Sequence, residues 1–348
     1  MTQTVDHEFG FELRVCAWAD RAWPPDTDGS RPAIVARQLG TRERRWDTVV
    51  IEVNPHELDD RSAFGPDGLD GDLLHVLRHA PAAWTYYRDA LPDPGYPWRY
   101  VREAIHRASD RGVLEERKRG NRIEIRRIAP YPEWVSRIVA IENKPDLDAS
   151  AARALRDQLE RDVAFGLADE VWVATRATGR SIEPALLEDM PVEAGILAVA
   201  LDDDTAPSSV EVLWHPRSLA VSEPGTRIEE RADSSTYGER AARFEYEDPD
   251  TKAKKRLTIA ERAYERGWRS YLDTMRPDCR HFDVERVGHA YLPDCRAKGR
   301  EPTAGECQQA CASFEPEPPR WRQGSWPIDG GPGKTIKDVL GDRRSRRR

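Results

Sequence analysis

The clearest pattern of apolar and polar positions lies between Arg137 and Thr175. Ile138–Ile141 is a β-branched apolar run, which predicts a buried strand. The residues that follow form a helix that ends near Gly166, because apolar side chains recur there on one stripe. The stripe consists of Leu155, Leu159 and Val163. A second apolar run covers Glu170–Thr175, so the segment predicts a strand–helix–strand unit with a right-handed parallel crossover.

Similar patterns predict elements on both sides of this unit. Phe9–Trp23 has the spacing of an amphipathic helix, and Ala33–Leu39 and Arg45–Val53 have that of paired strands. The polar residues 54–71 are rich in Pro, Gly and Asp, which predicts a linker. Towards the C-terminus the pattern predicts a helix, two strands that extend the sheet, and a second helix, at Glu183–Asp189, Gly195–Leu201, Val210–Trp214 and Ala260–Met275.

Residues 73–128 have a character of their own. The pattern predicts three helices, at Leu73–Arg78, Ala82–Leu91 and Trp98–Arg111. It then predicts a β-hairpin, formed by Gly112–Glu116 and Arg122–Ile128. Three helices followed by a basic hairpin resemble a winged helix-turn-helix domain. This resemblance implies that the third helix enters a DNA groove and that the hairpin meets phosphates.

The charge of this segment agrees with a DNA partner. Between Pro97 and Ile128 there are ten arginines and lysines against five acidic residues, although the whole chain has a net charge of −8. The candidate DNA-binding residues are Arg99, Arg102 and His106 on the third helix, and Arg117, Lys118, Arg119 and Arg122 on the hairpin. The alternative is a solvated basic face on a packing or protein-docking module.

Length and composition limit the class of protein. A chain of 348 residues with eleven tryptophans predicts two or three small domains. No apolar run approaches membrane-spanning length, so we expect a soluble, cytoplasmic protein without a membrane partner. Lysine accounts for only eight of the 54 basic residues, and abundant acidic residues with little lysine suit a salt-rich cytoplasm.

The strongest indication of function is at the end of the first strand of the central unit. That strand continues into Glu142-Asn143-Lys144, and residues two apart in a strand point to the same side. A carboxylate and an ammonium group at the end of a buried strand are costly unless they have a role. Asp47 opens the second N-terminal strand, immediately before its apolar run.

With residues 73–128 set aside, the chain runs helix, strand, strand, strand, helix, strand. This order, with these polar residues, resembles the PD-(D/E)XK nuclease superfamily, which includes restriction endonucleases and RecB-like nucleases. The resemblance implies a restriction endonuclease-like α/β core, a mixed sheet flanked by helices, with an inserted winged helix-turn-helix domain and a Cys-rich C-terminal segment. The catalytic residues that it implies are Asp47, Glu142, Lys144, Glu12 and Gln158.

The resemblance also implies a mechanism. Asp47 and Glu142 are expected to hold Mg²⁺ or Mn²⁺, which take oxygen ligands, and the backbone carbonyl of Asn143 can add another. Such an ion lowers the pKa of an attacking water, and Lys144 would orient that water. Asp162 departs from the pattern, because RecB-like enzymes usually have a tyrosine there. The layout is also similar to an uncharacterised family of halophilic archaea.

Cysteine gives a second candidate site. Four of the five cysteines, Cys279, Cys295, Cys307 and Cys311, lie in the C-terminal region, and Cys16 lies on the first helix. In an intracellular chain such a cluster indicates a metal before disulfides. Two ligand sets remain open: a Zn²⁺ site of the four C-terminal thiolates, or a [4Fe–4S] cluster that joins Cys16 to three of them, as in iron–sulfur RecB-like nucleases. His281 or His289 can substitute for one ligand.

A phosphate-binding loop is not expected. The sequence GGPGKT at Gly330–Thr335 resembles the end of one, but Ile328 stands where the first glycine belongs and no strand precedes it, so no nucleoside triphosphate partner is predicted. The predicted divisions are 1–60 and 131–225 for the nuclease-like core, 70–130 for the winged-helix insertion, 226–328 for the C-terminal segment and 329–348 for a flexible basic tail.

The sequence therefore predicts a metal-dependent DNA nuclease, of use in repair, recombination or defence. Two alternatives stay open: a non-catalytic DNA-binding protein that retains the fold, and a scaffold in a larger complex.

Overall fold

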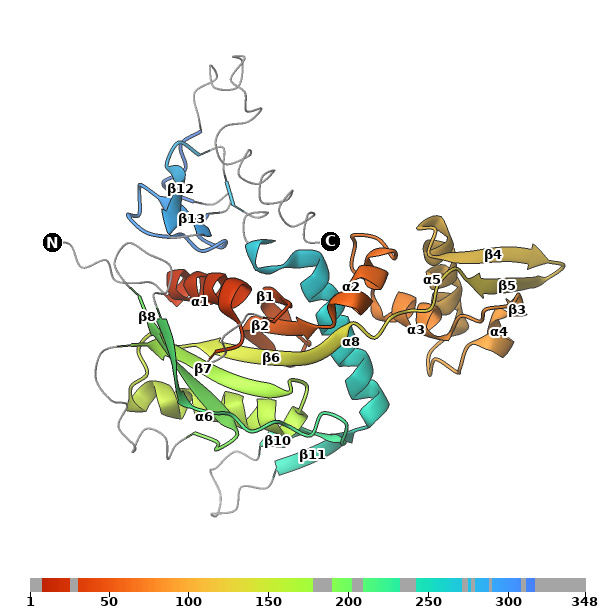
Figure 1. The fold of residues 1–348 in the computed structure, drawn as a ribbon, viewed down its shortest axis with the longest axis horizontal. Coiled ribbons are helices and arrows are strands. Elements are labelled where there is room, and N and C mark those ends of the chain that lie inside the picture. Colours follow the sequence, from red (N-terminus) through yellow and green to blue (C-terminus); the bar gives the residue numbers. More distant parts are fainter. Residues whose placement is uncertain are drawn as a thin grey trace.

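The centre of the molecule is a mixed six-stranded sheet with helices on both faces (Figure 1). The computed structural model describes residues 8–25, 31–177, 190–201, 209–231, 242–270, 275–276, 279–287, 290–307 and 311–316. The sheet has the order β1-β2-β6-β7-β8-β9. Its strands are β1 (Ala33–Gly40), β2 (Arg45–Val53), β6 (Val135–Asn143), β7 (Glu170–Arg176), β8 (Ala194–Ala200) and β9 (Ser209–Trp214). The predicted α/β class is confirmed.

The strand–helix–strand unit forms as the sequence predicts. β6 and β7 pair in parallel, and α6 (Ala149–Phe165) connects them. Asp148 caps the start of α6 by accepting a hydrogen bond from the Ala151 N–H group, and Gly166 ends the helix in the left-handed conformation (φ 55°). β1, β2 and β6 pair antiparallel to one another, so the sheet changes from antiparallel to parallel at β6.

The two faces of the sheet form separate cores. On one face α1 (Glu8–Ala22) packs on side chains that include Val50, Val139 and Ile141. On the other face α6 and α8 (Pro249–Arg266) pack on alternate positions of the same strands. Helices on both faces explain why these strands are apolar throughout rather than alternating.

Between β2 and β6 the chain builds a lobe with its own core (Figure 1). Its elements are α3 (Gly71–His79), β3 (Thr85–Tyr86), α4 (Tyr87–Ala90), α5 (Trp98–Asp110), β4 (Leu114–Arg119) and β5 (Arg122–Arg127). The three strands form one sheet in the order β3-β5-β4. The helix predicted over Ala82–Leu91 is wrong in its first half, because Thr85 and Tyr86 pair with β5 and only four residues after them are helical. β-Branched and aromatic residues favour that strand.

A buried ion pair joins the lobe to the core. The predicted linker 54–71 is partly wrong, because α2 (Pro55–Ser62) begins there behind the capping residue Asn54. Arg61 of α2 forms two hydrogen bonds, of 2.7 and 2.5 Å, with Glu261 of α8, and both side chains are fully buried. Glu261 also accepts bonds from the Leu69 N–H group and the Tyr131 hydroxyl, which lie on the two connections of the lobe.

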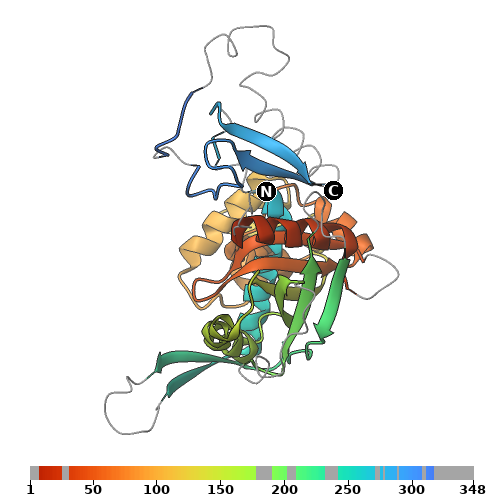
Figure 2. The same ribbon diagram turned by 90° about the vertical axis from the view of Figure 1, so that its left-hand side faces the viewer.

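The C-terminal part adds two hairpins and a long helix. β10 (Gly225–Arg231) and β11 (Ala242–Glu247) form a hairpin that the sequence did not predict (Figure 2). The helix predicted at Ala260–Met275 is displaced: α8 begins at Pro249, capped by Asp248, and ends before Gly267. β12 (Phe282–Val287) and β13 (Ala290–Cys295) form the second hairpin, and apolar side chains of both strands join the core that includes α1.

Some predictions fall outside the described residues: the helix Glu183–Asp189, the GGPGKT sequence and the basic tail. Among the helices that the structure describes, none has the length and apolar character needed to cross a membrane.

Candidate active site

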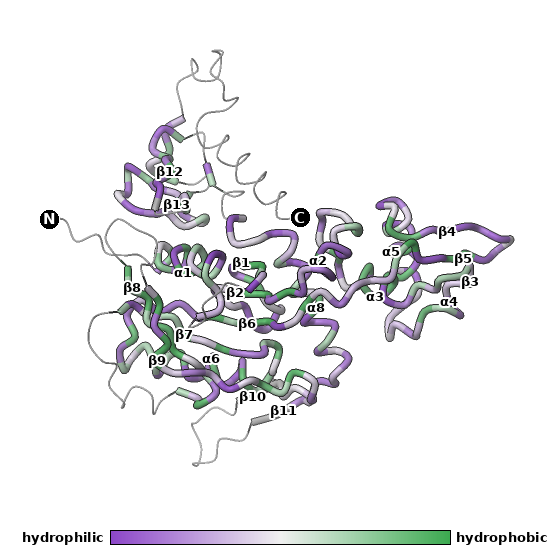
Figure 3. The backbone as a smooth tube through the Cα atoms, viewed as in Figure 1, coloured by the Kyte–Doolittle hydropathy of each residue, from purple (hydrophilic) through white to green (hydrophobic). Residues whose placement is uncertain are grey.

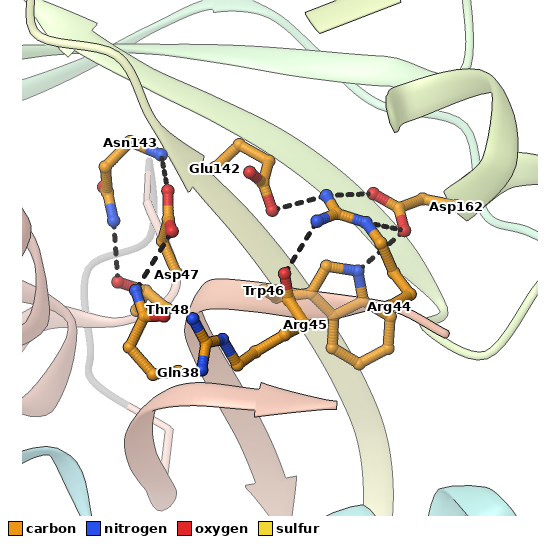
Figure 4. A network of polar contacts seen from close by, with 9 residues as sticks. All are labelled: Gln38, Arg44, Arg45, Trp46, Asp47, Thr48, Glu142, Asn143 and Asp162. Atoms are coloured by element: carbon orange, nitrogen blue, oxygen red, sulfur yellow. Dashed lines mark hydrogen bonds and ion pairs between the residues drawn. The ribbon is translucent and has the colours of Figure 1, made fainter. Parts of the chain in front are cut away.

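Asp47 and Glu142 lie beside each other at one end of the central sheet. β2 and β6 are antiparallel with Thr48 opposite Ile141, so the next step of the ladder brings Asp47 opposite Glu142. The backbone N–H of Asn143 donates to Asp47 Oδ2 over 3.0 Å (Figure 4). The Asn143 side chain donates to Thr48 Oγ1, also over 3.0 Å, and so fixes the two strand ends together.

This end of the sheet opens into a cavity of about 790 Å³. Its walls come from α1, from β1 and β2, from the end of β6, from α6 and from the turn 303–305. All five residues that the sequence proposes as catalytic line it: Glu12, Asp47, Glu142, Lys144 and Gln158. Residues that are far apart along the chain are therefore brought to one hollow surface.

Gln38 connects two of the carboxylates, although the sequence pattern did not predict a role for it. Its side-chain amide donates to Glu12 Oε1 over 3.2 Å and to Asp47 Oδ1 over 3.1 Å. Among the described residues, Gln38 is the only non-glycine residue with a positive φ, 51°. Such a conformation costs about 1 kcal/mol or more and persists where the surroundings enforce it. The polar pair Arg37-Gln38 inside an apolar strand was the available signal.

Two arginines neutralise carboxylates at the site. Arg37 forms two hydrogen bonds with Glu12, of 2.9 and 3.0 Å. Arg44 forms two bonds of 2.8 Å with Asp162 and one of 2.6 Å with Glu142 (Figure 4). The Trp46 indole also donates to Asp162, over 2.8 Å. Asp162 is therefore held in an ion pair, whereas nothing local in the sequence marked Arg44.

Burial and mutual repulsion disfavour negative charge on the carboxyl groups of the site. Glu142 is only 4 % exposed, and burial together with the charges of Asp47 and Asp162 raises the pKa of its carboxyl to about 8, although Arg44 opposes the shift. Burial also raises the pKa of Glu12, against the effect of Arg37. A cation that entered the cavity would therefore relieve repulsion among the carboxylates.

Lys144 follows the last residue of β6. Its backbone N–H donates to the Ala174 carbonyl over 2.9 Å, which holds it against β7. Its ammonium group forms an ion pair with Glu8 of α1, and about a third of its side chain is exposed. The lysine is therefore at the rim of the cavity, on the solvent side of Glu142.

The predicted DNA-binding residues all belong to the lobe and are all exposed: Arg99, Arg102, His106, Arg117, Lys118, Arg119 and Arg122. The first three lie on α5 and the others on the β4–β5 hairpin, whose outer end is hydrophilic (Figure 3). The hairpin turns at Gly120-Asn121, with Gly120 at φ 59°. Glu116 bonds His106 and Glu124 bonds Arg117, so part of the basic charge is already paired.

The cysteines separate into two groups. Cys16 lies on the buried face of α1, and its thiol is 3.2 Å from Thr48 Oγ1. Burial raises the pKa of that thiol. The other four line one small cavity: Cys279, Cys295, Cys307 and Cys311. His281 is paired with Glu315, and His289 lies outside the described residues. Within the described ranges, no three or more His, Cys, Asp and Glu side chains are already spaced to hold a metal ion.

A sequence model of one protein family matches residues 34–316, which is most of the chain. Its description is a family of unknown function, DUF5787. The chain belongs to the DUF5787 family. No curated protein and no solved structure matches. The DUF5787 match includes the strands that carry Asp47 and Glu142, the lobe and the four C-terminal cysteines, whereas Glu12 and Cys16 precede it.

Proposed function

We propose that this protein is a metal-dependent nuclease that hydrolyses phosphodiester bonds in DNA. One observation carries the proposal: Asp47, Glu142 and Lys144, from separate segments, line one cavity at the end of a mixed sheet. The order of elements around them is the one that the resemblance to PD-(D/E)XK nucleases implies. Glu12 and Gln158, which many members of that superfamily carry at these places, line the same cavity and support the proposal.

The chemistry follows from the charges. Asp47 and Glu142 would hold Mg²⁺ or Mn²⁺, which would activate a water molecule and offset the charge that develops on the phosphate. Lys144, at the rim, would orient the attacking water and donate to the phosphate oxygens in the transition state. Gln38 and the Asn143 N–H group fix the Asp47 carboxylate, so that it does not have to be ordered when the cation binds.

The lobe supports DNA as the substrate. Its order of helix, short strand, two helices and hairpin resembles that of a winged helix-turn-helix domain, and its exposed arginines and lysine lie on α5 and the hairpin. In such domains the helix reads a groove and the hairpin contacts phosphates. We propose that this lobe binds DNA; it joins β2 and β6 at Val53 and Val135, the ends of these strands opposite to Asp47 and Glu142.

Cleavage of DNA by the purified protein tests the proposal. With Mg²⁺ or Mn²⁺, the wild-type chain is expected to cut linear or circular DNA, and Lys144→Ala to cut at least about 10²-fold more slowly, as when one transition-state donor is lost. Lys254→Ala is the matched control, because Lys254 is exposed on α8 and does not line the cavity. If Lys144→Ala cuts as fast as the wild type, the proposed active site is wrong.

A separate measurement tests the lobe. Lys118 and Arg119 are exposed at the hairpin tip, and Lys118→Gln with Arg119→Gln should remove two phosphate contacts. The slope of log affinity against log salt concentration should then fall by about 1.8, since each contact contributes about 0.9. Lys254→Gln with Arg266→Gln, two exposed positions on α8, should leave the slope unchanged. If the two double variants show the same slope of log affinity against log salt concentration, the hairpin does not contact DNA phosphates.

The second candidate function is a DNA-binding protein that keeps the nuclease-like core but does not cut. The contacts of Arg44 with Glu142 and of Arg37 with Glu12 favour it, because these guanidinium groups already supply cations to the carboxylates. Arg44 has two bonds to Asp162 and only one to Glu142, so a metal ion would displace one contact. This second function is supported if the protein binds DNA in a salt-dependent way but does not cleave it with either Mg²⁺ or Mn²⁺.

A further inference from the structure

The four C-terminal cysteines meet although they come from four different turns. Cys279 precedes β12, Cys295 ends β13, Cys307 closes the turn that begins at Thr303, and Cys311 begins the next turn. All four are free thiols, and they line one cavity of about 20 Å³. We call them the four-cysteine cluster. Cys279 and Cys295 are buried, and Cys307 and Cys311 are partly exposed.

The backbone around the cluster is held by local bonds. The Phe282 N–H group donates to the Cys279 carbonyl over 3.0 Å, and the N–H groups of Lys298 and Gly299 donate to the Cys295 carbonyl over 2.9 and 2.7 Å. Gly299 makes this last turn possible with a φ of 65°. Arg300 pairs with Glu306 beside Cys307 over 2.5 Å. These backbone and ion-pair contacts hold the turns that carry Cys279, Cys295 and Cys307 without using the sulfur atoms of Cys279 and Cys295.

The surroundings favour thiolates. Arg276 and Lys298 line the cavity together with the sulfur atoms. The backbone N–H of Arg276 donates to Cys307 Sγ over 3.4 Å, a bond that strengthens when the sulfur carries charge. Four thiolates in one cavity would repel one another, and a divalent cation is the species that would offset this repulsion.

The size of the cavity favours a single metal ion over an iron–sulfur cluster. A volume of about 20 Å³ is close to the space that one water molecule needs, so it suits a single ion. An iron–sulfur cluster holds several iron and sulfide atoms and would need a larger space. Cys16, the fourth ligand in the iron–sulfur plan, does not line this cavity and instead contacts Thr48. Four thiolates are a common ligand set for structural zinc.

We propose that the four-cysteine cluster binds one structural Zn²⁺ ion. Because no described group is already at ligand spacing, binding would draw the four sulfur atoms towards the centre of the cavity. Each thiol loses its proton to solvent, so Zn²⁺ and four thiolates carry a net charge of −2, which Arg276 and Lys298 offset. The expected geometry is tetrahedral, with Zn–S distances of about 2.3 Å.

Zinc at this position would hold one wall of the acidic cavity. Thr303, Ala304 and Gly305 line that cavity and immediately precede Glu306 and Cys307. Arg14 of α1 forms an ion pair of 2.8 Å with Glu301 in the same segment. The zinc ion thus links the C-terminal segment to the wall of the cavity, whichever reaction takes place there.

Metal content tests the inference without any DNA. The full chain, purified under reducing conditions, is expected to contain about one zinc ion per molecule by mass spectrometry of metals. Cys311→Ser, at a partly exposed position, should lower the zinc content at least about tenfold after dialysis against a weak chelator. Cys295→Ser should do the same, and Cys16→Ser should keep the wild-type content. Replacement of zinc by Co²⁺ should give intense thiolate-to-metal absorption that is lost in Cys311→Ser.

Each other result overturns the inference. Zinc retained equally in Cys311→Ser and Cys295→Ser would place the ion elsewhere. A brown protein with iron and sulfide would establish a cluster in place of zinc. A chain without metal, or with disulfides among the four cysteines in a non-reduced peptide map, would exclude the site. These outcomes do not depend on nuclease activity, so they leave the proposed function to its own test.

Discussion

Replacing Asp47 with asparagine is expected to lower Mg²⁺-dependent DNA cleavage by about a thousandfold, because the carboxylate would contribute directly to the metal site. Metal stabilisation of the transition-state charge is worth several kcal/mol, and each 1.4 kcal/mol is about tenfold in rate. The amide of the Asp47→Asn variant keeps an oxygen that can accept from the Asn143 N–H group, so the strand ends should remain aligned. Single-turnover cleavage at saturating DNA is the measurement.

The loss should not come from unfolding. Asp47 is one of the charges that raise the pKa of Glu142, so removal of its charge relieves repulsion in the metal-free protein. We expect the free energy of unfolding of Asp47→Asn, measured with a chelator, to lie within about 1 kcal/mol of the wild-type value, because relief of this repulsion offsets the lost bond from Gln38 to Oδ1. Asp146→Asn is the control, because Asp146 is exposed and does not line the cavity. If the cleavage rate of Asp47→Asn lies within a few-fold of the control's rate, Asp47 does not hold the catalytic metal ion.

Replacing Glu261 with glutamine is expected to destabilise the protein by about 3–5 kcal/mol, because Arg61 would be left buried without a counter-charge. Guanidinium unfolding, followed by tryptophan fluorescence, measures this difference. It would be a large share of a total stability of about 5–15 kcal/mol. The Leu69 N–H group bonds Glu261 Oε2 and the Tyr131 hydroxyl bonds Oε1, so the single amide oxygen of glutamine keeps only one of these positions as an acceptor, and the loss includes an acceptor as well as the charge.

Glu265→Gln is the matched control, because Glu265 is exposed one turn further along α8 and should change stability by no more than about 0.5 kcal/mol. The double variant Arg61→Met with Glu261→Met should lie well above Glu261→Gln in stability, since apolar replacement of a whole buried pair is often neutral. A Glu261→Gln protein as stable as the control would show that this ion pair does not fix the lobe to the core.

The sequence predicted the strands and helices whose signals are local. Ile138–Ile141 and Glu170–Thr175 are apolar runs with a capped helix between them, and the structure contains that unit. The helix start at Pro249 was missed because the first turns of α8 are almost entirely polar. The strand at Thr85 and Tyr86 was missed for a different reason: these residues are a strand because they pair with β5, about 40 residues further along the chain. Such pairing between distant segments cannot be read from a short stretch of sequence.

The candidate site divides in the same way. Asp47, Glu142 and Lys144 were identified because polar residues interrupt apolar strands at their ends. Arg44 lies in a turn among other charged residues, and its partner Asp162 lies 118 positions further on, so the sequence alone does not pair them. The convergence of four cysteines with irregular spacing is likewise a property of the folded chain.

The position of a bound cation tests the central claim most directly. Crystals grown with Mn²⁺ should show an anomalous-scattering peak between the carboxylates of Asp47 and Glu142, at distances of about 2.0–2.4 Å from their oxygen atoms. The peak should be absent in crystals of Asp47→Asn. An empty cavity at saturating Mn²⁺, with Arg44 still bonded to Glu142, would contradict the account and leave a DNA-binding protein with an inactive core.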